Sequence, residues 1–532
     1  MESKIVPVTG STLVCLAAAL LFLVGVMRRC WFGEKSLPPG PTGWPVVGSL
    51  YSLGPRNIPA CRRFAALAAK YGALMFLRMG SRPTVVISDS TTAKEFFKSQ
   101  DNNFSSRPRL ATGKHFGYDY SSVVFSSGEK FTEMRLIYSA ELLSSTNVKK
   151  LAPVRMEEIR FLMADVLRRS ESERLGDRPH ATEGLINITS MVFKANLNLM
   201  GRIIFSQSLF GDSGTVNATP KEVENFKFFV KSATRLVGLF NVGDYIPALR
   251  WLDLQGVEGD LQRLKPHQEG LLLPIIHQYR KMHHSAEGFS KQEDRRVDFI
   301  AALVAKYSTL SDENIMAVAI DLIVGGSDSA STAVEWGMTE LLRHPHYLQE
   351  VQAELDAVVG RDRLVELSDC DKLPFLDCVV RETLRLHPPS PLAIPHYSSQ
   401  ECTLGGCRIP AKTTAYVNIH AIHRDPKVYT NPNEFQPKRF KTLPSMQVMA
   451  QNCESIPFSA GRRACPGQKF AFPTVMLMLG NLLQCFSWSP PPGIRGEDID
   501  VDEAPGVVCS RLKPLVASAT PRVEKSVILD HK

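Results

Sequence analysis

The most specific pattern in this sequence is Phe458-Ser459-Ala460-Gly461-Arg462-Arg463-Ala464-Cys465-Pro466-Gly467, which precedes an apolar run of helical spacing over 470–483. Cys465 lies between turn residues just before the expected helix. Backbone N–H groups and the positive end of a helix both favour thiolate over thiol, so this sulfur can bind a metal. The glycines let the backbone pass close to a flat cofactor, and Arg463 can neutralise an acidic group on it.

A single cysteine is more often a buried structural thiol than a ligand, so the neighbouring positions are needed to distinguish the two. Phe458, Gly461, Arg463, Cys465 and Gly467 together reproduce the signature FxxGxRxCxG. With it the chain resembles the cytochrome P450 haem-thiolate monooxygenases along essentially its whole length. The resemblance implies a mainly α fold with small β-sheets behind one N-terminal transmembrane helix, and haem b as cofactor. Cys465 would ligate the iron, and Phe458, Arg463 and Gly467 would contact the cofactor.

A second pattern of the same family is Glu382-Thr383-Leu384-Arg385, where the i,i+3 spacing places both charged side chains on one helix face. In the family this pair meets an arginine from a later loop, which here would be Arg439. A buried acid between two guanidinium groups is costly to break on one side, so the implied role is to lock the core behind the haem. Lys438 replaces the family's usual acid beside that arginine.

The third pattern lies in the long helical run over 312–342, where Val324-Gly325-Gly326-Ser327-Asp328-Ser329-Ala330-Ser331 interrupts the regular spacing. Each glycine costs a helix interior about 1 kcal/mol, and a kink with room for a ligand would explain two of them. By resemblance, dioxygen would bind beside the two glycines. Ser329 would donate a hydrogen bond to it, and Asp328 would relay protons. The family more often has threonine at the position of Ser329.

Two further cofactor contacts follow from the resemblance. Arg135, in Phe131-Thr132-Glu133-Met134-Arg135, is where the family has a propionate-binding arginine. Phe131 replaces the tryptophan of that family motif and has no N–H group to donate. His396 is where the family often has an arginine or histidine that contacts a propionate, although a surface histidine is the alternative.

The N-terminus predicts a membrane anchor. Residues 1–30 contain a long uncharged apolar run that ends at Arg28 and Arg29, which favours a retained single-pass signal anchor with a cytosolic body. A cleavable signal peptide is the alternative, but it carries its positive charge before the apolar run. Residues 31–48 are rich in proline and predict a stiff hinge. Residues 49–532 would form the haem-thiolate domain. The anchor and the family resemblance together imply that the protein lies at the endoplasmic reticulum membrane, in contact with lipid.

Composition limits the partners. The chain has 62 basic and 54 acidic residues, for a net charge of +8 spread along its length, which argues against nucleic acid as a partner. Its eleven cysteines form no dense framework and are expected to be mostly reduced. Because no flavin or nicotinamide fingerprint is present, electrons would come from outside the chain, and the family resemblance implies NADPH-cytochrome P450 reductase as their donor. Arg462, Lys469 and Lys438 could meet such an acidic partner.

The body is expected to be mostly helical. Two short strands are predicted between residues 73 and 89, with a turn near Gly80-Ser81. The polar stretch 284–296 is the best candidate for an internal linker. Helical spacing marks the stretches 132–169, 222–239, 257–283, 312–342 and 345–359.

The predicted function is a monooxygenase that uses O2 and acts on a small apolar or phenolic metabolite. Asp244-Tyr245-Ile246-Pro247 and the hinge resemble the plant A-type group, which includes phenylpropanoid or flavonoid and terpenoid hydroxylases. A reductase-independent haem-thiolate isomerase or dehydratase and a non-catalytic haem-binding protein are the alternatives. By analogy, the substrate pocket would be formed by residues 105–120, 239–242, 322–326, 391–394 and 507–510.

Overall fold

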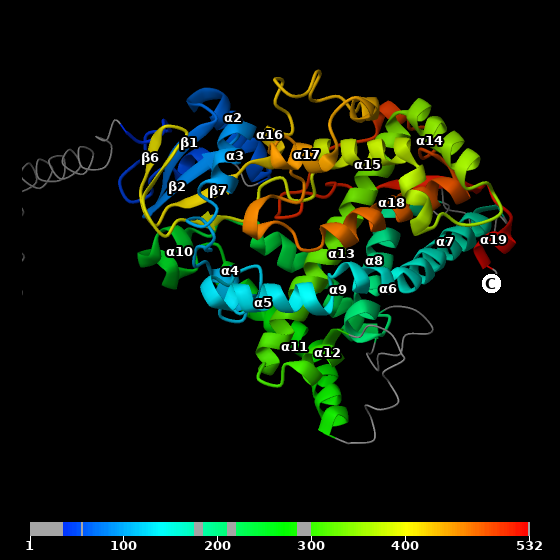
Figure 1. Cartoon of the computed structure of the whole chain (residues 1–532), viewed down its shortest axis with the longest axis horizontal. Coiled ribbons are helices and arrows are strands. Elements are labelled where there is room, and N and C mark those ends of the chain that lie inside the picture. The colour runs from blue at the N-terminus through cyan, green and yellow to red at the C-terminus, as the bar shows by residue number, and fades with distance from the viewer. Residues whose placement is uncertain (1–35, 55–56, 175–184, 210–219, 285–298, 530–532) are drawn as a thin grey trace, which may run out of the picture.

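The computed structural model describes residues 36–54, 57–174, 185–209, 220–284 and 299–529. The expected anchor at 1–30 and nearly all of the expected linker at 284–296 lie outside these residues. Figure 1 shows a β-rich part beside a larger part made of helices. This arrangement confirms the prediction of a mainly α fold with small β-sheets.

The larger sheet has four strands in the order β1-β2-β7-β4. Strands β1 (Leu74–Met79) and β2 (Arg82–Ile87) form the predicted hairpin, and β2 pairs in parallel with β7 (Thr414–Val417). Alternate residues of β1 are buried, as expected of a strand with one face on the core. Gly80 at the turn has φ +59°, and a Cβ there would lie 2.3 Å from the carbonyl oxygen of Tyr245, so this position requires glycine.

The described part of the predicted hinge, residues 36–48, runs along this sheet. The N–H of Phe76 donates to the carbonyl of Pro39, and Gly48 forms a β-bridge with Met79. The proline-rich segment is therefore attached to the body by backbone hydrogen bonds over the part that the structure describes.

Helix α13 (Asp312–Arg343) runs through the middle of the fold (Figure 1) and is buried over most of its length. Ser311 caps it by accepting a hydrogen bond from the N–H of Asn314. The helix continues through Gly325 and Gly326, so the predicted helical run over 312–342 is confirmed. Packing on α8 (Ile188–Phe205) and α18 (Gln468–Cys485) supports the segment that the two glycines weaken. Among described residues, α13 is the helix long and apolar enough to cross a membrane, but 67% of its most apolar window is buried as core.

The stretch 132–169, which shows helical spacing in the sequence, forms three helices. These are α5 (Gly128–Glu141), α6 (Ser145–Lys150) and α7 (Ala152–Arg174). The break has a local cause: Ser144 caps α6, and the side chain of Asn147 donates to the carbonyls of Ala140 and Glu141 at the end of α5.

The other long helices lie close to their predicted positions, as α9 (Pro220–Val237), α11 (Val257–His284) and α14 (Pro345–Val358). The remaining helices are α2 (Ala60–Tyr71), α3 (Ser90–Lys98), α4 (Ala111–His115), α10 (Val242–Tyr245), α12 (Phe299–Lys306), α15 (Pro374–Leu386), α16 (Ile419–Ile422), α17 (Met446–Gln451) and α19 (Lys525–Leu529). The remaining strands are β3 (Ile186–Asn187), β4 (His396–Tyr397), β5 (Cys402–Leu404), β6 (Cys407–Ile409), β8 (Phe486–Ser489) and β9 (Val516–Pro521).

Candidate active site

The loop around Cys465 owes its shape to its glycine and to two backbone contacts. Gly461 has φ +70°, and a Cβ there would lie 2.4 Å from a carboxylate oxygen of Asp101. That carboxylate accepts the N–H of Arg462, and the N–H of Cys465 donates to the carbonyl of Phe458 at 2.9 Å. Helix α18 begins three residues after the cysteine. The loop thus holds Cys465 at the N-terminal end of a long helix, as the sequence predicted.

Cys465 lies deep in the molecule, and its accessible surface faces an internal cavity. Burial raises the pKa of its thiol above the ordinary value, although the N–H groups of Gly467 and Gln468 and the charge of Arg135 oppose the rise. The N–H groups thus favour thiolate, as the sequence predicted, but they do not outweigh the effect of burial. A metal ion deprotonates a coordinating thiol outright, so a thiolate at this position depends on a bound metal.

The cavity has a volume of about 350 Å³ and separates the Cys465 loop from α13. This volume lies within the range of small-molecule sites. Its α13 wall consists of Asp321, Leu322, Val324, Gly325, Gly326, Ser329, Ala330 and Ala333. The opposite wall consists of Pro457, Phe458, Ser459, Arg463, Cys465, Pro466, Gly467, Phe470, Ala471, Thr474 and Val475. A flat group inserted between the two walls would have the sulfur on one side and the helix on the other.

Arg463 is buried in the cavity wall and is held by main-chain carbonyls. Its guanidinium donates to the carbonyls of Ser105 at 2.7 Å, Ser126 at 2.6 Å and Val123 at 3.2 Å. The guanidinium carbon lies 3.5 Å from the centre of the Phe131 ring. Phe131, the departure from the family's tryptophan, thus forms a cation–π stack under this arginine, a role that needs no N–H group.

Three further basic side chains line the same cavity. Arg135 is half-buried and has no hydrogen-bond or ion-pair partner among the described residues; burial lowers its pKa, and Cys465 opposes this. Arg107 is bonded to the carbonyls of Ile394 and Pro395. His396 is buried, with Nδ1 3.0 Å from the carbonyl of Phe104.

These basic groups repel one another, and none of them forms an ion pair with an acidic side chain in the part of the chain that the structure describes. Burial lowers the pKa of His396 well below its ordinary value, and the charges of Arg107 and Arg463 add to the effect. A cluster of buried cations without a carboxylate is costly unless a bound anion completes it. The sequence patterns identified three of the four residues. They did not identify Arg107 as a member of this basic cluster. Its position inside the predicted pocket segment 105–120 could have indicated it.

The α13 wall divides the predicted residues into two groups. A Cβ on Gly325 would meet open space, whereas one on Gly326 would lie 2.7 Å from the sulfur of Met200 on α8. Gly325 therefore opens the cavity, and Gly326 mainly permits close helix packing. The hydroxyl of Ser329 lines the cavity and donates to the carbonyl of Gly325 at 2.6 Å. Asp328 does not line the cavity. Its carboxyl group forms a hydrogen bond with Thr234, and Thr234 lines the cavity.

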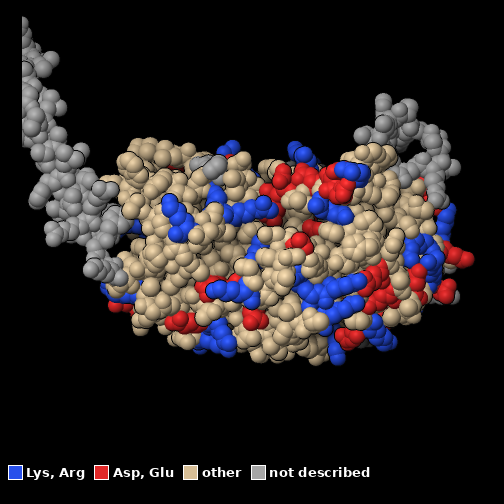
Figure 2. All heavy atoms as spheres, turned by 90° about the horizontal axis from the view of Figure 1, so that it is seen from above, with Lys and Arg blue, Asp and Glu red and all other residues tan. Residues whose placement is uncertain are grey.

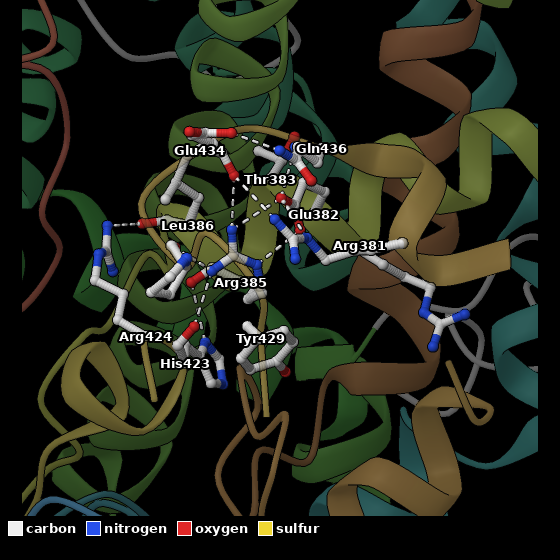
Figure 3. A network of polar contacts seen from close by, with 12 residues as sticks. Arg381, Glu382, Thr383, Arg385, Leu386, His423, Arg424, Tyr429, Glu434 and Gln436 are labelled. Carbon is white, nitrogen blue, oxygen red and sulfur yellow. Dashed lines mark hydrogen bonds and ion pairs between the residues drawn. The ribbon is translucent and has the colours of Figure 1, made fainter. Parts of the chain in front are cut away.

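Behind the Cys465 loop, the second pattern forms a fully paired network (Figure 3). Glu382 accepts hydrogen bonds from Arg385 at 2.7 and 2.8 Å and from Arg439 at 3.1 Å, and both Glu382 and Arg385 are fully buried. His423 bridges this network to the loop, because its ring lies 3.2 Å from the carbonyl of Arg385 and accepts the N–H of Ile456 at 2.8 Å. The predicted meeting of Glu382, Arg385 and Arg439 is thus present.

The predicted pocket segments contribute unequally. Segments 322–326, 391–394 and 507–510 contribute to the lining of the main cavity, and 105–120 contributes through Arg107 and Phe116. Residues 239–242 do not line it; Leu239 and Phe240 line a smaller neighbouring pocket. Asn196, Met200 and Ile203 of α8 and the buried acid Asp321 were missed. The signal for Asp321 was that it is the one charged residue in the stretch 314–327 of α13.

A cysteine that faces a cavity with several arginines in its wall and a buried helix opposite is the arrangement expected of a haem-thiolate protein. A cytochrome P450 family model matches residues 38–516. The chain is 34% identical to a flavonoid 3'-monooxygenase of Arabidopsis thaliana, over 97% of this chain and 98% of that one. It is 36% identical to a flavonoid 3'-monooxygenase of Crocosmia x crocosmiiflora, over 92% and 93%, and 33% identical to a flavonoid 3',5'-hydroxylase of Eustoma exaltatum subsp. russellianum, over 97% and 98%. The chain belongs to the cytochrome P450 family.

It follows that the protein is a haem-dependent monooxygenase that uses O2, as the sequence predicted. The cavity fits haem b in chemical terms. The sulfur of Cys465 faces the cavity, the unpaired guanidinium of Arg135 matches an acidic substituent, and Gly325 leaves open space opposite the sulfur.

Proposed function

We propose that this monooxygenase hydroxylates an aromatic ring of a flavonoid or a related phenylpropanoid. One oxygen atom of O2 enters a C–H bond, the other leaves as water, and two electrons and two protons come from outside the chain. The observation that carries the proposal is the apolar cavity over Cys465 in a chain that matches flavonoid hydroxylases over nearly its full length. Aromatic rings suit this lining because most of its surface is apolar.

We further propose how the chain holds its cofactor. Cys465 would ligate the iron as thiolate, and Phe458 and Gly467 would lie against the same face of the ring. Arg135, Arg463 and His396 would receive the two propionates, because these groups share one part of the cavity without an acid of their own. When bound, thiolate-ligated haem supplies the activation of dioxygen and the transfer of one oxygen atom.

Proton delivery is assigned to Ser329 and Asp328. The Ser329 hydroxyl donates to the carbonyl of Gly325 and must rotate to reach a ligand in the cavity. Serine rotates more freely than threonine because its Cβ is unbranched. Asp328 would act through Thr234, which hydrogen-bonds this carboxyl group and also lines the cavity. Burial raises the pKa of Asp328, although the hydrogen bond from Thr234 and the charge of Lys231 oppose the rise, and a raised pKa makes this carboxyl group a better proton carrier.

Electrons would come from NADPH-cytochrome P450 reductase. Of the three basic residues expected to meet such a partner, Arg462 pairs with Asp101 and Lys438 pairs with Glu350. Lys469 is exposed. Figure 2 shows basic and acidic side chains interspersed over one face of the molecule. A docking surface would therefore combine small basic clusters instead of one uniform patch.

The domain organisation and location are proposed as the sequence predicted them: an anchor at 1–30, a hinge at 31–48 and a cytosolic haem domain at 49–532, at the endoplasmic reticulum membrane. Two exposed tryptophans support the proposal that the hinge side of the haem domain faces the membrane. Trp44 is 67% exposed and Trp251 is 80% exposed. Each belongs to a segment that is hydrogen-bonded to the β1–β2 turn, so lipid could contact both near the hinge.

The proposed activity is tested by reconstituting the full chain with haem, the reductase, NADPH and O2. Flavonoids should yield products that carry one additional oxygen atom, and the reduced carbonyl adduct should show the red-shifted Soret band of thiolate ligation. Cys465→Ala should abolish both signals. Turnover without a reductase would support the isomerase alternative, and the absence of product from every flavonoid would contradict the proposed substrate class.

A further inference from the structure

Asp321 is a buried carboxyl group inside the main cavity. It lies four residues before Gly325 on α13 and is 9% exposed. Its hydrogen bonds come from one short loop: the N–H of Val124 donates at 3.1 Å, and the hydroxyl of Ser122 and the N–H of Val123 also donate. An ionised carboxylate offers about four acceptor positions, so these three donors leave about one for a ligand.

No described lysine, arginine or histidine forms an ion pair with this carboxyl group. Burial raises the pKa of Asp321 to about 7, and only the three hydrogen bonds oppose the rise. Elsewhere the fold pairs its most deeply buried acid, as it does for Glu382 with Arg385 and Arg439. A carboxyl group kept unpaired in an apolar cavity gains stability from any ligand that donates a hydrogen bond to it.

We propose that Asp321 is a specificity-determining residue that accepts a hydrogen bond from a phenolic hydroxyl of the substrate. The inference rests on the proposed function for the substrate class. Asp321, Gly325 and Ser329 follow one another at i, i+4 and i+8, so they share one face of the helix. About 12 Å of helix axis separates Asp321 from Ser329. An aromatic substrate anchored at its hydroxyl therefore extends along α13 and presents its far ring beside Gly325 and Ser329.

The test measures substrate-induced spectral shifts of the haem-loaded full chain. Two ligand pairs are titrated: a hydroxyflavone with its methyl ether, and 4-phenylphenol with 4-methoxybiphenyl. Asp321→Asn should weaken binding of both phenols about tenfold, the loss expected for a hydrogen bond to a charged group, and change the Kd of the ethers less than twofold. Two variants serve as controls. Ser122→Ala removes a loop contact without changing the carboxyl group, and Glu335→Gln alters another buried acid of α13 outside the cavity lining.

Each outcome is decisive. Equal losses for phenols and ethers, or a loss that Ser122→Ala reproduces, would overturn the inference, because Asp321 would then act only by holding the loop. The inference would also be overturned if neither phenol caused a spectral shift in the wild-type protein. Wild-type protein that binds phenylphenol but no flavone would refute the proposed substrate class alone, since the biphenyl pair still compares Asp321→Asn with wild type.

Discussion

Glu382 and Asp321 are both buried carboxyl groups on helices, but their surroundings are opposite. Glu382 on α15 lies between two arginines and also accepts the N–H of Gln436 (Figure 3). Asp321 on α13 faces the cavity and has only loop hydrogen bonds. Two arginines show the same contrast. Arg385 forms an ion pair with Glu382, whereas Arg135 has no ion-pair partner among the described residues. Glu382 and Arg385 thus form a closed network behind the Cys465 loop, whereas Asp321 and Arg135 face the cavity where a cofactor or substrate would bind.

The largest effect is expected from breaking the paired region. Glu382→Gln would leave Arg385 and Arg439 buried without their acid and should lower the free energy of unfolding by about 3–5 kcal/mol. Urea unfolding and haem retention after purification measure this loss. Glu350→Gln is the matched control, because Glu350 pairs with Lys438 and Lys441 at the surface and should cost less than about 1 kcal/mol. Similar losses for the two variants would refute the distinction.

The pH dependence of stability should have opposite signs for paired and unpaired acids. The folded-state pKa of Asp321, about 7, lies above its unfolded value near 3.9, so the folded state binds the extra proton and stability falls as pH rises from about 4 to 7. Burial alone would raise the pKa of Glu503, but the nearby ring of His387 and the charge of Arg62, whose Nε lies 2.8 Å from the carboxylate, hold it at about 2. Its contribution is therefore present above pH 4 and is lost as pH falls toward 2.

This prediction is measured by urea unfolding across pH. The stability difference between wild type and Asp321→Asn should grow in favour of wild type as pH falls from 7 to 4. The difference between wild type and Glu503→Gln should shrink below pH 4, by up to about 3 kcal/mol for a shift of two units. Parallel pH profiles for the two variants would contradict the contrast.

An unpaired cation should matter for the cofactor more than for the fold. Arg135→Gln should weaken haem retention by about 2 kcal/mol, the value of a hydrogen bond between charged groups, and leave the stability of the apoprotein unchanged. Haem transfer to an apo-acceptor protein and unfolding of the apoprotein measure the two quantities. Arg439→Gln is the comparison, because it should lower both. A clear loss of apoprotein stability in Arg135→Gln would show that this arginine has a structural partner.

The smallest effect concerns the two glycines of α13. Gly325→Ala should raise the free energy of unfolding by up to about 1 kcal/mol, because alanine favours the helix and its Cβ meets open space. In Gly326→Ala the displacement of Met200 should offset that gain. Thermal unfolding of the apoproteins compares them. Equal stabilisation would show that Met200 adapts freely.

The sequence by itself determined the elements that depend on local spacing: the hairpin of β1 and β2, the long helices, the loop that holds Cys465, and the pair Glu382 and Arg385. Glycine conformation, i,i+3 spacing and helix periodicity act between neighbours along the chain, so short patterns contain them. The same patterns identified the cytochrome P450 family.

Only the tertiary structure decided which side chains meet. It placed Asp321 in the cavity and Asp328 outside its lining, turned Gly325 toward open space and Gly326 toward Met200, and stacked Phe131 under Arg463. It also left Arg135 without a hydrogen-bond or ion-pair partner among the described residues and made Arg107 part of the basic cluster. These relations join segments distant in the sequence, and the energy of a buried charge depends on what those segments bring beside it.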